Sequence, residues 1–206
     1  MVQYKKDDIK KKIDNAALYV FAEKGYKDTG ISDIAKKAHV SVGNIYRYYK
    51  GKDDIFYSSI VQPDFIDMFK SITLKKISSA KDTMPGLSEG SQSHLFFLMN
   101  EEFIEFIISN RERMLIIFNG AKGTRYEPVK NEIIDYLIKT VKENYSKQDN
   151  KVIFDIKNEA VIRTIYIKFI EMMMDVLKES STPTEIKSSL NIINTYHLFG
   201  VTNLFN

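Results

Sequence analysis

The chain contains no cysteine and no tryptophan, and only four of its 206 residues are proline. The lack of cysteine excludes disulfides and thiol catalysis, and it agrees with a reducing compartment. No apolar run reaches the ~20 residues that a membrane-spanning helix needs, because amide and acidic side chains interrupt residues 95–108. The N-terminal residues are polar and charged, unlike a signal peptide, so we expect a cytoplasmic protein with no membrane partner.

Motifs for catalysis and cofactor binding are also missing. The three histidines, His39, His94 and His197, lie far apart, and none belongs to a His-Glu-x-x-His pattern. The chain has neither a Gly-x-Ser-x-Gly nucleophile motif nor a phosphate-binding loop. The adjacent carboxylates at 53–54 and 101–102 point to different helix faces, which does not suit a matched acid and base. We therefore expect no enzyme, no catalytic residues, no metal and no cofactor, although carboxylates from separate helices could still converge in a bundle.

The charge is distributed unevenly along the chain. The whole sequence has a formal net charge of +3, but residues 1–55 carry 12 basic and 8 acidic residues, a net charge of +4. The remainder carries 18 basic and 19 acidic residues, a net charge of −1. An N-terminal excess of this kind suits a contact with nucleic acid, although lysines 5, 6 and 10–12 would also solvate an exposed helix.

One segment, residues 31–52, has the pattern of two short helices joined by a tight turn. The first has an apolar stripe at helical spacing, made of Ile31, Ile34, Ala35 and Ala38. After a break at His39, the Ser41 hydroxyl can accept from backbone amides and begin a second helix. This second helix is expected to bury Ile45 and Tyr49 and to expose Asn44, Tyr46, Arg47 and Tyr48. A short helix that presents donors and aromatic hydroxyls suits a DNA major groove.

The flanking segments extend this pair of helices into a larger unit. Residues 9–21 carry an amphipathic stripe, and Gly25 is expected to end that helix before the next begins at Thr29 or Gly30. After Gly51, acids at 53 and 54 suit the first turn of a further helix. Lys52 lies beside the free amides of that helix start, where a phosphate would bind.

A longer series of residues keeps the order and spacing of a known family without a gap: Phe21-Ala22-Glu23-Lys24-Gly25-Tyr26, Thr29, Ile34-Ala35, Val40-Ser41, Gly43-Asn44-Ile45-Tyr46, Tyr48-Tyr49-Lys50 and Lys52. On these residues the chain resembles the TetR family of bacterial transcriptional regulators. The resemblance implies a double-stranded DNA operator as partner and a DNA-binding site made of Thr29, Ser41, Val42, Gly43, Asn44, Tyr46, Arg47, Tyr48 and Lys52.

Two positions depart from the family pattern. His39 stands at a turn where the family often has glycine, because a positive φ is easiest for glycine there. Val42 stands where the family often has lysine, and a valine can contact a thymine methyl but no phosphate. The operator preferences of the family therefore do not transfer to this chain.

Beyond residue 52 the periodicity stays helical, which predicts an all-α fold. We expect a helix over 52–76 that Pro63 bends or interrupts, a loop over 78–93, and helices over 94–109, 110–121, 127–145, 154–179 and 183–204. These elements divide into a three-helix helix-turn-helix domain, residues 1–66, that includes the start of the connecting helix, and a helical-bundle domain for effector binding and dimerisation, residues 67–206.

The last two predicted helices have wide apolar stripes. The stripes contain Val161, Ile165, Phe169, Met173 and Leu177 in the first helix, and Ile186, Leu190, Ile193, Tyr196 and Phe199 in the second. Either the two helices pack only into their own core, or two copies of the pair form a four-helix interface between subunits. A helix-turn-helix favours the homodimer, because a palindromic operator needs paired recognition helices.

Aromatic and methionine side chains crowd the middle of the chain, where most of them must form the core. Because such side chains also line adaptable pockets, the resemblance implies an effector cavity, for which we select Phe96, Met99, Phe103, Phe118, Tyr136 and Phe169. The polar candidates to orient a ligand there are His94, Asn100, Glu102, Arg113 and Asn119. A lining of this kind predicts a hydrophobic or aromatic small molecule as effector.

Together these observations predict a ligand-responsive DNA-binding regulator, a repressor that a hydrophobic small molecule releases from a palindromic operator. Two other functions stay open. A constitutive DNA-binding protein would lack an internal pocket, and an all-helical enzyme that carries a DNA-binding unit would show convergent carboxylates in its body.

Overall fold

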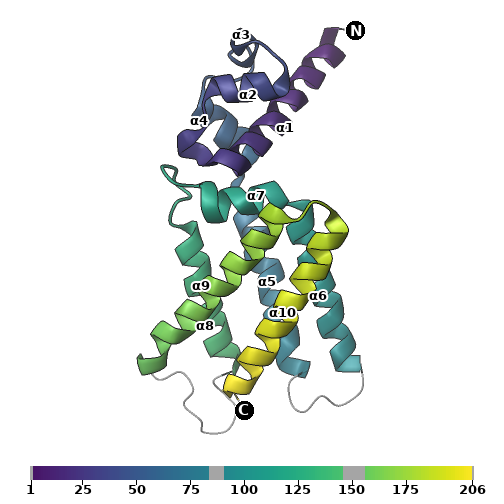
Figure 1. Ribbon diagram of the computed structural model, residues 1–206, viewed down its shortest axis with the longest axis vertical. Coiled ribbons are helices and arrows are strands. Elements are labelled where there is room, and N and C mark those ends of the chain that lie inside the picture. The colour runs from purple at the N-terminus through teal and green to yellow at the C-terminus, as the bar shows by residue number, and fades with distance from the viewer. Residues whose placement is uncertain (1, 84–90, 146–155, 206) are drawn as a thin grey trace. The chain divides into compact units, whose positions relative to one another are not determined.

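The computed structural model describes residues 2–83, 91–145 and 156–205, and these residues contain helices and turns but no strand (Figure 1). The N-terminal helices are α1 (Val2–Asp28), α2 (Ile31–Ala38), α3 (Val42–Ile45) and α4 (Lys52–Ile55), which continues as the π-helical turn η1 (Phe56–Ile60). They are followed by α5 (Pro63–Thr83), α6 (Ser91–Ser109), α7 (Arg111–Leu115) with the π-helical turn η2 (Ile116–Gly120), α8 (Val129–Tyr145), α9 (Ile156–Glu179) and α10 (Pro183–Phe205). The predicted all-α fold is therefore confirmed.

The chain forms two compact units. The first contains Met1–Asp67 together with Glu112–Val129, and the second contains Met68–Arg111 together with Lys130–Asn206. The sequence predicted a single boundary at residue 66. The first division falls close to it, but residues 112–129 cluster with the N-terminal unit. None of the described helices combines the length and apolar character needed to cross a membrane.

The core of the first unit follows from the predicted apolar stripes. Ile13 of α1, Ile34 of α2 and Ile45 of α3 are fully buried. Phe21 packs edge-on against Phe56 of η1, with ring centroids 5.1 Å apart. These contacts fix the three N-terminal helices against one another, because large apolar side chains in a close-packed core leave little room for movement.

Residues 112–129 join the first unit through close backbone packing and hydrogen bonds. At Gly120 of η2 an added Cβ would lie 3.2 Å from the Gly25 Cα, so only a glycine allows this approach without a shift. Gly25 itself adopts a φ of +77° and breaks the helical backbone inside α1, three residues before Asp28, at the position where the sequence predicted the helix to end. The Arg113 Nε donates to the Ile60 carbonyl at 3.0 Å, and the Tyr126 hydroxyl donates to the Val61 carbonyl at 3.1 Å.

These last two bonds satisfy carbonyls at a helix break. Pro63 has no N–H, and it disfavours helical backbone at the residue before it. The single helix expected over 52–76 is accordingly interrupted at residues 61–62, and α5 then runs to Thr83. The loop expected over 78–93 was wrong at both ends, because helix covers residues 78–83 and 91–93; residues 84–90 lie outside the described part.

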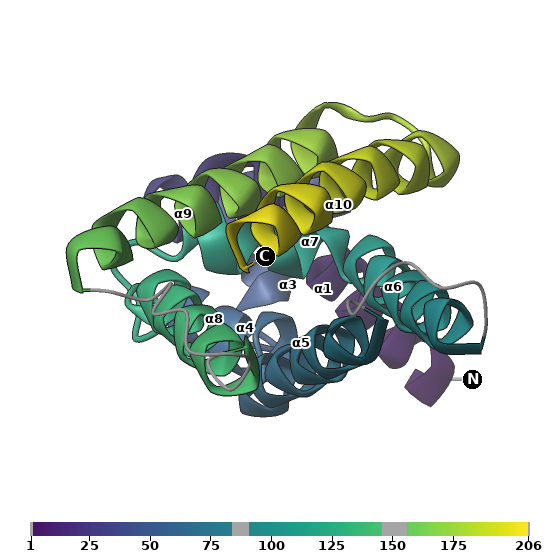
Figure 2. The same cartoon turned by 90° about the horizontal axis from the view of Figure 1, so that it is seen from below.

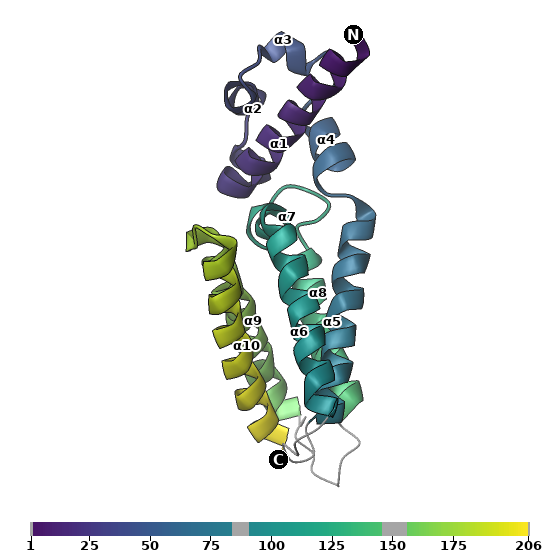
Figure 3. The same cartoon turned by 90° about the vertical axis from the view of Figure 1, so that its right-hand side faces the viewer.

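The second unit arranges its long helices in two layers. Figures 2 and 3 show α9 and α10 side by side in one layer, and α5, α6 and α8 in the other. Fully buried isoleucines and leucines fill this unit, among them Ile104, Ile107, Ile134, Leu177 and Leu190. The Arg111 Nε donates to the Leu177 carbonyl at 2.6 Å and so ties the end of α9 to the start of α7.

Candidate functional site

The turn between α2 and α3 has the backbone geometry that the sequence indicated. His39 adopts φ 55° and ψ 42°, the left-handed conformation, and the N–H groups of His39 and Val40 close the end of α2. Ser41 is the N-cap of α3, and its Oγ accepts from the Asn44 amide at 3.2 Å. A histidine fills the position where glycine is easiest, and it adopts the positive φ nonetheless.

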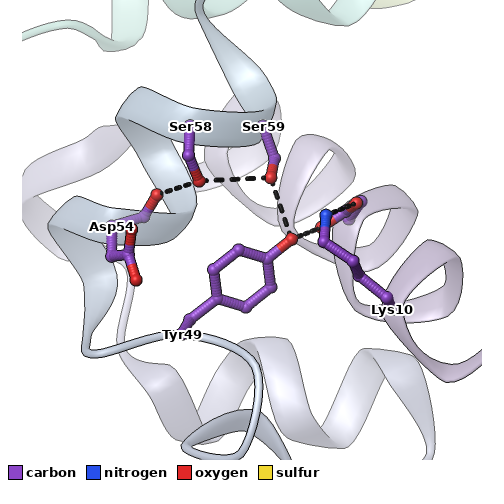
Figure 4. Close-up of polar contacts among 6 residues, drawn as sticks. Lys10, Tyr49, Asp54, Ser58 and Ser59 are labelled. Atoms are coloured by element: carbon purple, nitrogen blue, oxygen red, sulfur yellow. Dashed lines mark hydrogen bonds and ion pairs between the residues drawn. The ribbon is translucent and has the colours of Figure 1, made fainter. Parts of the chain in front are cut away.

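Tyr49 anchors the far end of this segment (Figure 4). Its ring is buried, and its hydroxyl donates to the Asp14 carboxylate of α1 and lies 2.8 Å from the Ser59 hydroxyl of η1. Lys10 pairs with the same carboxylate at 3.0 Å. Burial and the bond to Asp14 raise the pKa of Tyr49, so the hydroxyl stays protonated and able to donate. The segment from Ser41 to Tyr49 is thus fixed at its start by the Ser41 cap and at its end by the contacts of Tyr49 with α1 and η1.

The face left outside by this scaffold is polar and aromatic. The side chains of Ser41, Tyr46 and Arg47 are exposed, as are Val42 and the backbone of Gly43, while Asn44 and Tyr48 are half-buried. Tyr46 exposes 56% of its surface, although aromatic residues usually bury most of theirs. Seven of the nine residues predicted to bind DNA therefore gather on one short segment with accessible donors.

The other two predicted residues make contacts within the first unit. Thr29 is buried, and its hydroxyl donates to the Gly25 carbonyl at 2.7 Å, so its side chain closes the end of α1. The Lys52 Nζ donates to the Tyr26 carbonyl at 2.8 Å and lies 4.4 Å from the centre of the Tyr26 ring. The ammonium at the start of α4 thus caps the C-terminal end of α1, and its contact with a DNA phosphate stays a prediction.

Lys52→Met is accordingly expected to lower the free energy of unfolding by ~1–2 kcal/mol, because it removes a charge-assisted hydrogen bond and a cation–π contact. Urea unfolding followed by circular dichroism measures this change. Lys50→Met is the matched control, since the Lys50 side chain is exposed, and it should leave stability within ~0.5 kcal/mol of the wild type. Equal stability of Lys52→Met and the wild type would contradict the capping role.

The residues predicted to line an effector cavity do not all lie in one unit. Phe103, Tyr136 and Phe169 belong to the second unit, and Phe103 and Phe169 are buried there. Phe118 is buried in the first unit, and its place in an effector site stays a prediction. The side chains of Phe96 and Met99 lie outside the described part of the structure.

The predicted polar anchors divide in the same way. Asn100 is buried in the second unit, whereas Glu102 pairs with Lys75 on its surface at 3.6 Å. Arg113 and Asn119 belong to the first unit, and the His94 side chain lies outside the described residues. Asn100 is thus the buried one of the described candidates in the second unit.

Sequence reasoning overlooked two polar residues of the second unit that lie on apolar stripes. Lys76 continues the spacing of the buried residues Phe69, Ile72 and Thr73 along α5, and Asn194 continues that of Ile186 and Leu190 along α10. The Lys76 ammonium donates to the Asn194 Oδ1 at 2.5 Å. A polar residue in phase with an apolar helix face was the signal that could have identified both. Among the described residues, no group of three or more histidines or carboxylates has the arrangement of a metal site.

The surface of α9 and α10 contains large apolar side chains in contact with solvent. Val161, Ile192 and Tyr196 expose 59%, 68% and 71% of their surface. A groove of about 400 Å³ between the two helices is lined by residues that include Phe169, Met172 and Tyr196. Ile193, which we expected at a subunit interface, is half-buried, and the Phe199 side chain lies outside the described part.

Residues 13–58 match a family described as bacterial regulatory proteins, tetR family. The chain is similar to the fatty acid metabolism regulator protein of Bacillus subtilis (strain 168), with 38% identity over 74 residues, and to the HTH-type transcriptional regulator HbdR of Aromatoleum sp. (strain CIB), with 46% identity over 48 residues. These matches cover 35% and 23% of this chain, and only 38% and 21% of the two relatives.

The likeness extends further along the chain in two other comparisons. An HTH-type transcriptional regulator of Staphylococcus aureus (strain USA300) is 27% identical over 146 residues, which cover 67% of this chain and 71% of the relative. The crystal structure of a TetR-like transcriptional regulator from Rhodococcus sp. RHA1 superposes with a TM-score of 0.51 at 19% identity, over 94% of this chain and 95% of that one, so the two share a fold. Residues 13–58, which contain the helix-turn-helix, therefore match the tetR family of bacterial regulatory proteins, and the chain shares the fold of a TetR-like regulator.

Proposed function

We propose that the protein is a homodimeric transcriptional regulator that binds a palindromic DNA operator and loses affinity for it when a small molecule occupies its second unit. The observation that carries this proposal is the exposed face of α3 and its following turn, which the N-cap at Ser41 and the buried anchor Tyr49 hold rigid. A rigid short helix with exposed donors is what direct readout in a major groove requires.

Charge and the family relatives support DNA as the partner. The net charge of +4 over residues 1–55 attracts phosphates, while the rest of the chain is nearly neutral. The relatives are named as regulators of transcription or metabolism, which favours a regulatory role over catalysis. Arg47 can bind guanine in a bidentate manner, and Val42 can contact a thymine methyl.

The exposed apolar surface of α9 and α10 supports dimerisation. Two recognition helices must lie about 34–36 Å apart to enter successive major grooves on one side of the duplex. The solvent-facing side chains Val161, Ile192 and Tyr196 offer a surface on which a second copy of the same helix pair would bury apolar area.

The regulatory step in this proposal is a shift between two dimer states. A ligand that binds more tightly to a state with a different helix spacing lowers the affinity for DNA by the ratio of its affinities for the two states. If operator occupancy blocks transcription, the protein acts as a repressor that its effector releases.

Selection of bound sequences from a random duplex library, followed by fluorescence anisotropy in a salt titration, tests the DNA-binding function. The expected product is a palindrome with half-sites about one helical turn apart. Enrichment of no sequence, together with binding that depends only on salt, would overturn the proposal of an operator-specific regulator.

Arg47→Ala is expected to weaken binding to the selected operator by ~1–3 kcal/mol, or roughly 5- to 150-fold, because one base contact is lost. Binding to a scrambled duplex should change much less. Lys178→Ala is the control for the loss of one positive charge, since Lys178 is exposed at the end of α9 in the other unit. If both variants bound the operator as tightly as the wild type, Arg47 would not read a base.

A further inference from the structure

The interface between the two layers of the second unit contains a ring of polar contacts. The Lys76 ammonium of α5 donates to the Asn194 Oδ1 of α10 at 2.5 Å, and the Asn100 Nδ2 of α6 donates to the Asn191 Oδ1 of α10 at 3.1 Å. A third contact links α5 with α6: the Lys76 Nζ lies 4.2 Å from the centre of the aromatic ring of Phe103, which follows Asn100 by one helical turn. Three helices from both layers therefore bring their polar side chains together at one place.

Three buried polar atoms near this ring have no hydrogen-bond partner among the described residues. They are the Asn100 Oδ1, the Asn194 Nδ2 and the His197 Nε2. Asn100 exposes 7% of its surface and Asn194 exposes 5%. Native proteins rarely leave such atoms unsatisfied, because each loses its hydrogen bonds to water on burial. Three such atoms together mark a place where a bound molecule, water or a ligand, can supply the missing bonds.

Two donors at this place, the Lys76 ammonium and the Asn194 Nδ2, favour a ligand with a negative charge, whereas the Asn100 Oδ1 can only accept and needs a donor such as water. An ammonium can only donate, so Asn194 must turn its Oδ1 to Lys76 and present its Nδ2 donor on the other side. Burial lowers the pKa of Lys76 to about 7, so a nearby anion would stabilise its charged form. Burial, with a contribution from Lys76, lowers the pKa of His197 to about 3, so this imidazole is neutral and can accept or donate one hydrogen bond.

The surroundings of the polar ring are aromatic. The His197 ring lies with its centroid 3.9 Å from that of Phe169 and 5.1 Å from that of Tyr166, both on α9. Phe103 lies under the Lys76 ammonium. A ligand that reaches the charged head position therefore has apolar side chains along its remaining length, and a fully hydrophilic anion would gain little there.

We propose that the second unit binds an apolar carboxylic acid, whose carboxylate accepts from the Lys76 ammonium and the Asn194 Nδ2 while its hydrocarbon part packs against Phe103 and Phe169. This inference deepens the proposed function, on which it rests for its regulatory consequence, because it names the chemical class of the effector and its head-group site. Lys76 and Asn194 are the specificity-determining residues, since a carboxylate accepts a charge-assisted hydrogen bond from the ammonium, which an uncharged analogue of the same shape accepts more weakly.

Isothermal titration calorimetry on the full chain tests this site with two matched pairs, octanoate with octanamide and 4-phenylbutyrate with 4-phenylbutyramide. At least one acid should bind the wild type ten or more times tighter than its amide. Lys76→Met should abolish this preference. Lys75→Met is the matched control, because Lys75 is the neighbouring lysine with an exposed side chain, and it should keep the preference.

A second variant tests the site independently, in case Lys76→Met does not fold. Asn194→Asp keeps the lysine but places a carboxylate beside it, so it should weaken acid binding more than tenfold and leave amide binding within a few fold. No binding of either acid, an equal affinity for acid and amide, or an unchanged preference in both variants would overturn the site, and water would then be the partner of the three atoms. Binding to the operator is measured in a separate experiment. If the protein binds DNA but no acid, only this inference is refuted. If it binds an acid but no DNA, only the regulatory function is refuted.

Discussion

In the proposed dimer, Ile192→Glu should separate the two subunits and lower the affinity for the operator more than a hundredfold. Ile192 exposes 68% of its surface on α10, next to the exposed Tyr196 one turn later. At a subunit interface, the new carboxylate would be buried in apolar contact in both copies, which costs several kcal/mol for each group. A monomer has one recognition helix and makes half of the base contacts, so the affinity for the operator should fall when the dimer dissociates. Sedimentation at micromolar concentration and anisotropy on the operator measure the two effects.

Leu74→Glu provides the matched control for this experiment. Leu74 is also an apolar residue with 41% exposure in the second unit, but it lies on α5, outside the α9 and α10 surface. The control should stay dimeric and bind the operator normally. Both variants should keep the helical circular dichroism signal of the wild type. A wild type that sediments as a monomer, or an Ile192→Glu variant that remains dimeric, would remove α9 and α10 as the interface.

The helix-turn-helix segment was predictable from sequence because its determinants are local. The capping bond of Ser41 spans three residues, and the left-handed turn at His39 and the helix end at Gly25 are backbone properties of single positions. Burial of Ile45 and Tyr49 followed from helical spacing alone. For the same reason, the all-α fold and most helix bounds agreed to within a few residues.

Contacts between distant residues could not be predicted in this way. The approach of Gly120 to Gly25 places residues 112–129 in the first unit, and nothing in the local pattern of either segment signals it. The sequence placed Lys52 beside free amides, but it did not show that the Lys52 ammonium donates to the carbonyl of residue 26. The hydrogen bond between Lys76 and Asn194 likewise joins residues that lie 118 positions apart in the sequence. Periodicity shows that a residue faces the interior, but not which polar group it meets there.

His197 is expected to make the protein sensitive to acid. Its pKa falls from 6.5 to about 3 on folding, because burial and the charge of Lys76 disfavour the imidazolium. The unfolded chain therefore binds more protons than the folded one between these two values, and stability falls as the pH decreases through this range. One pKa unit corresponds to ~1.4 kcal/mol, so this residue alone should cost ~2 kcal/mol at pH 5 relative to pH 7.5.

Urea unfolding of the wild type and of His197→Gln at several pH values measures this contribution. The variant cannot titrate, so its loss of stability between pH 7.5 and pH 5 should be ~2 kcal/mol smaller than that of the wild type. Between pH 7.5 and 8.5 the two proteins should differ by a constant amount, because His197 is neutral there in both the folded and the unfolded chain. If the stability curves of the two proteins stayed parallel down to pH 4, the folded protein would accommodate the charged His197 imidazolium. Its interior would then have to admit water or a counter-ion beside Lys76. In that case the polar ring between the layers would be a hydrated surface, and the buried head-group site for a carboxylate would lose its physical basis.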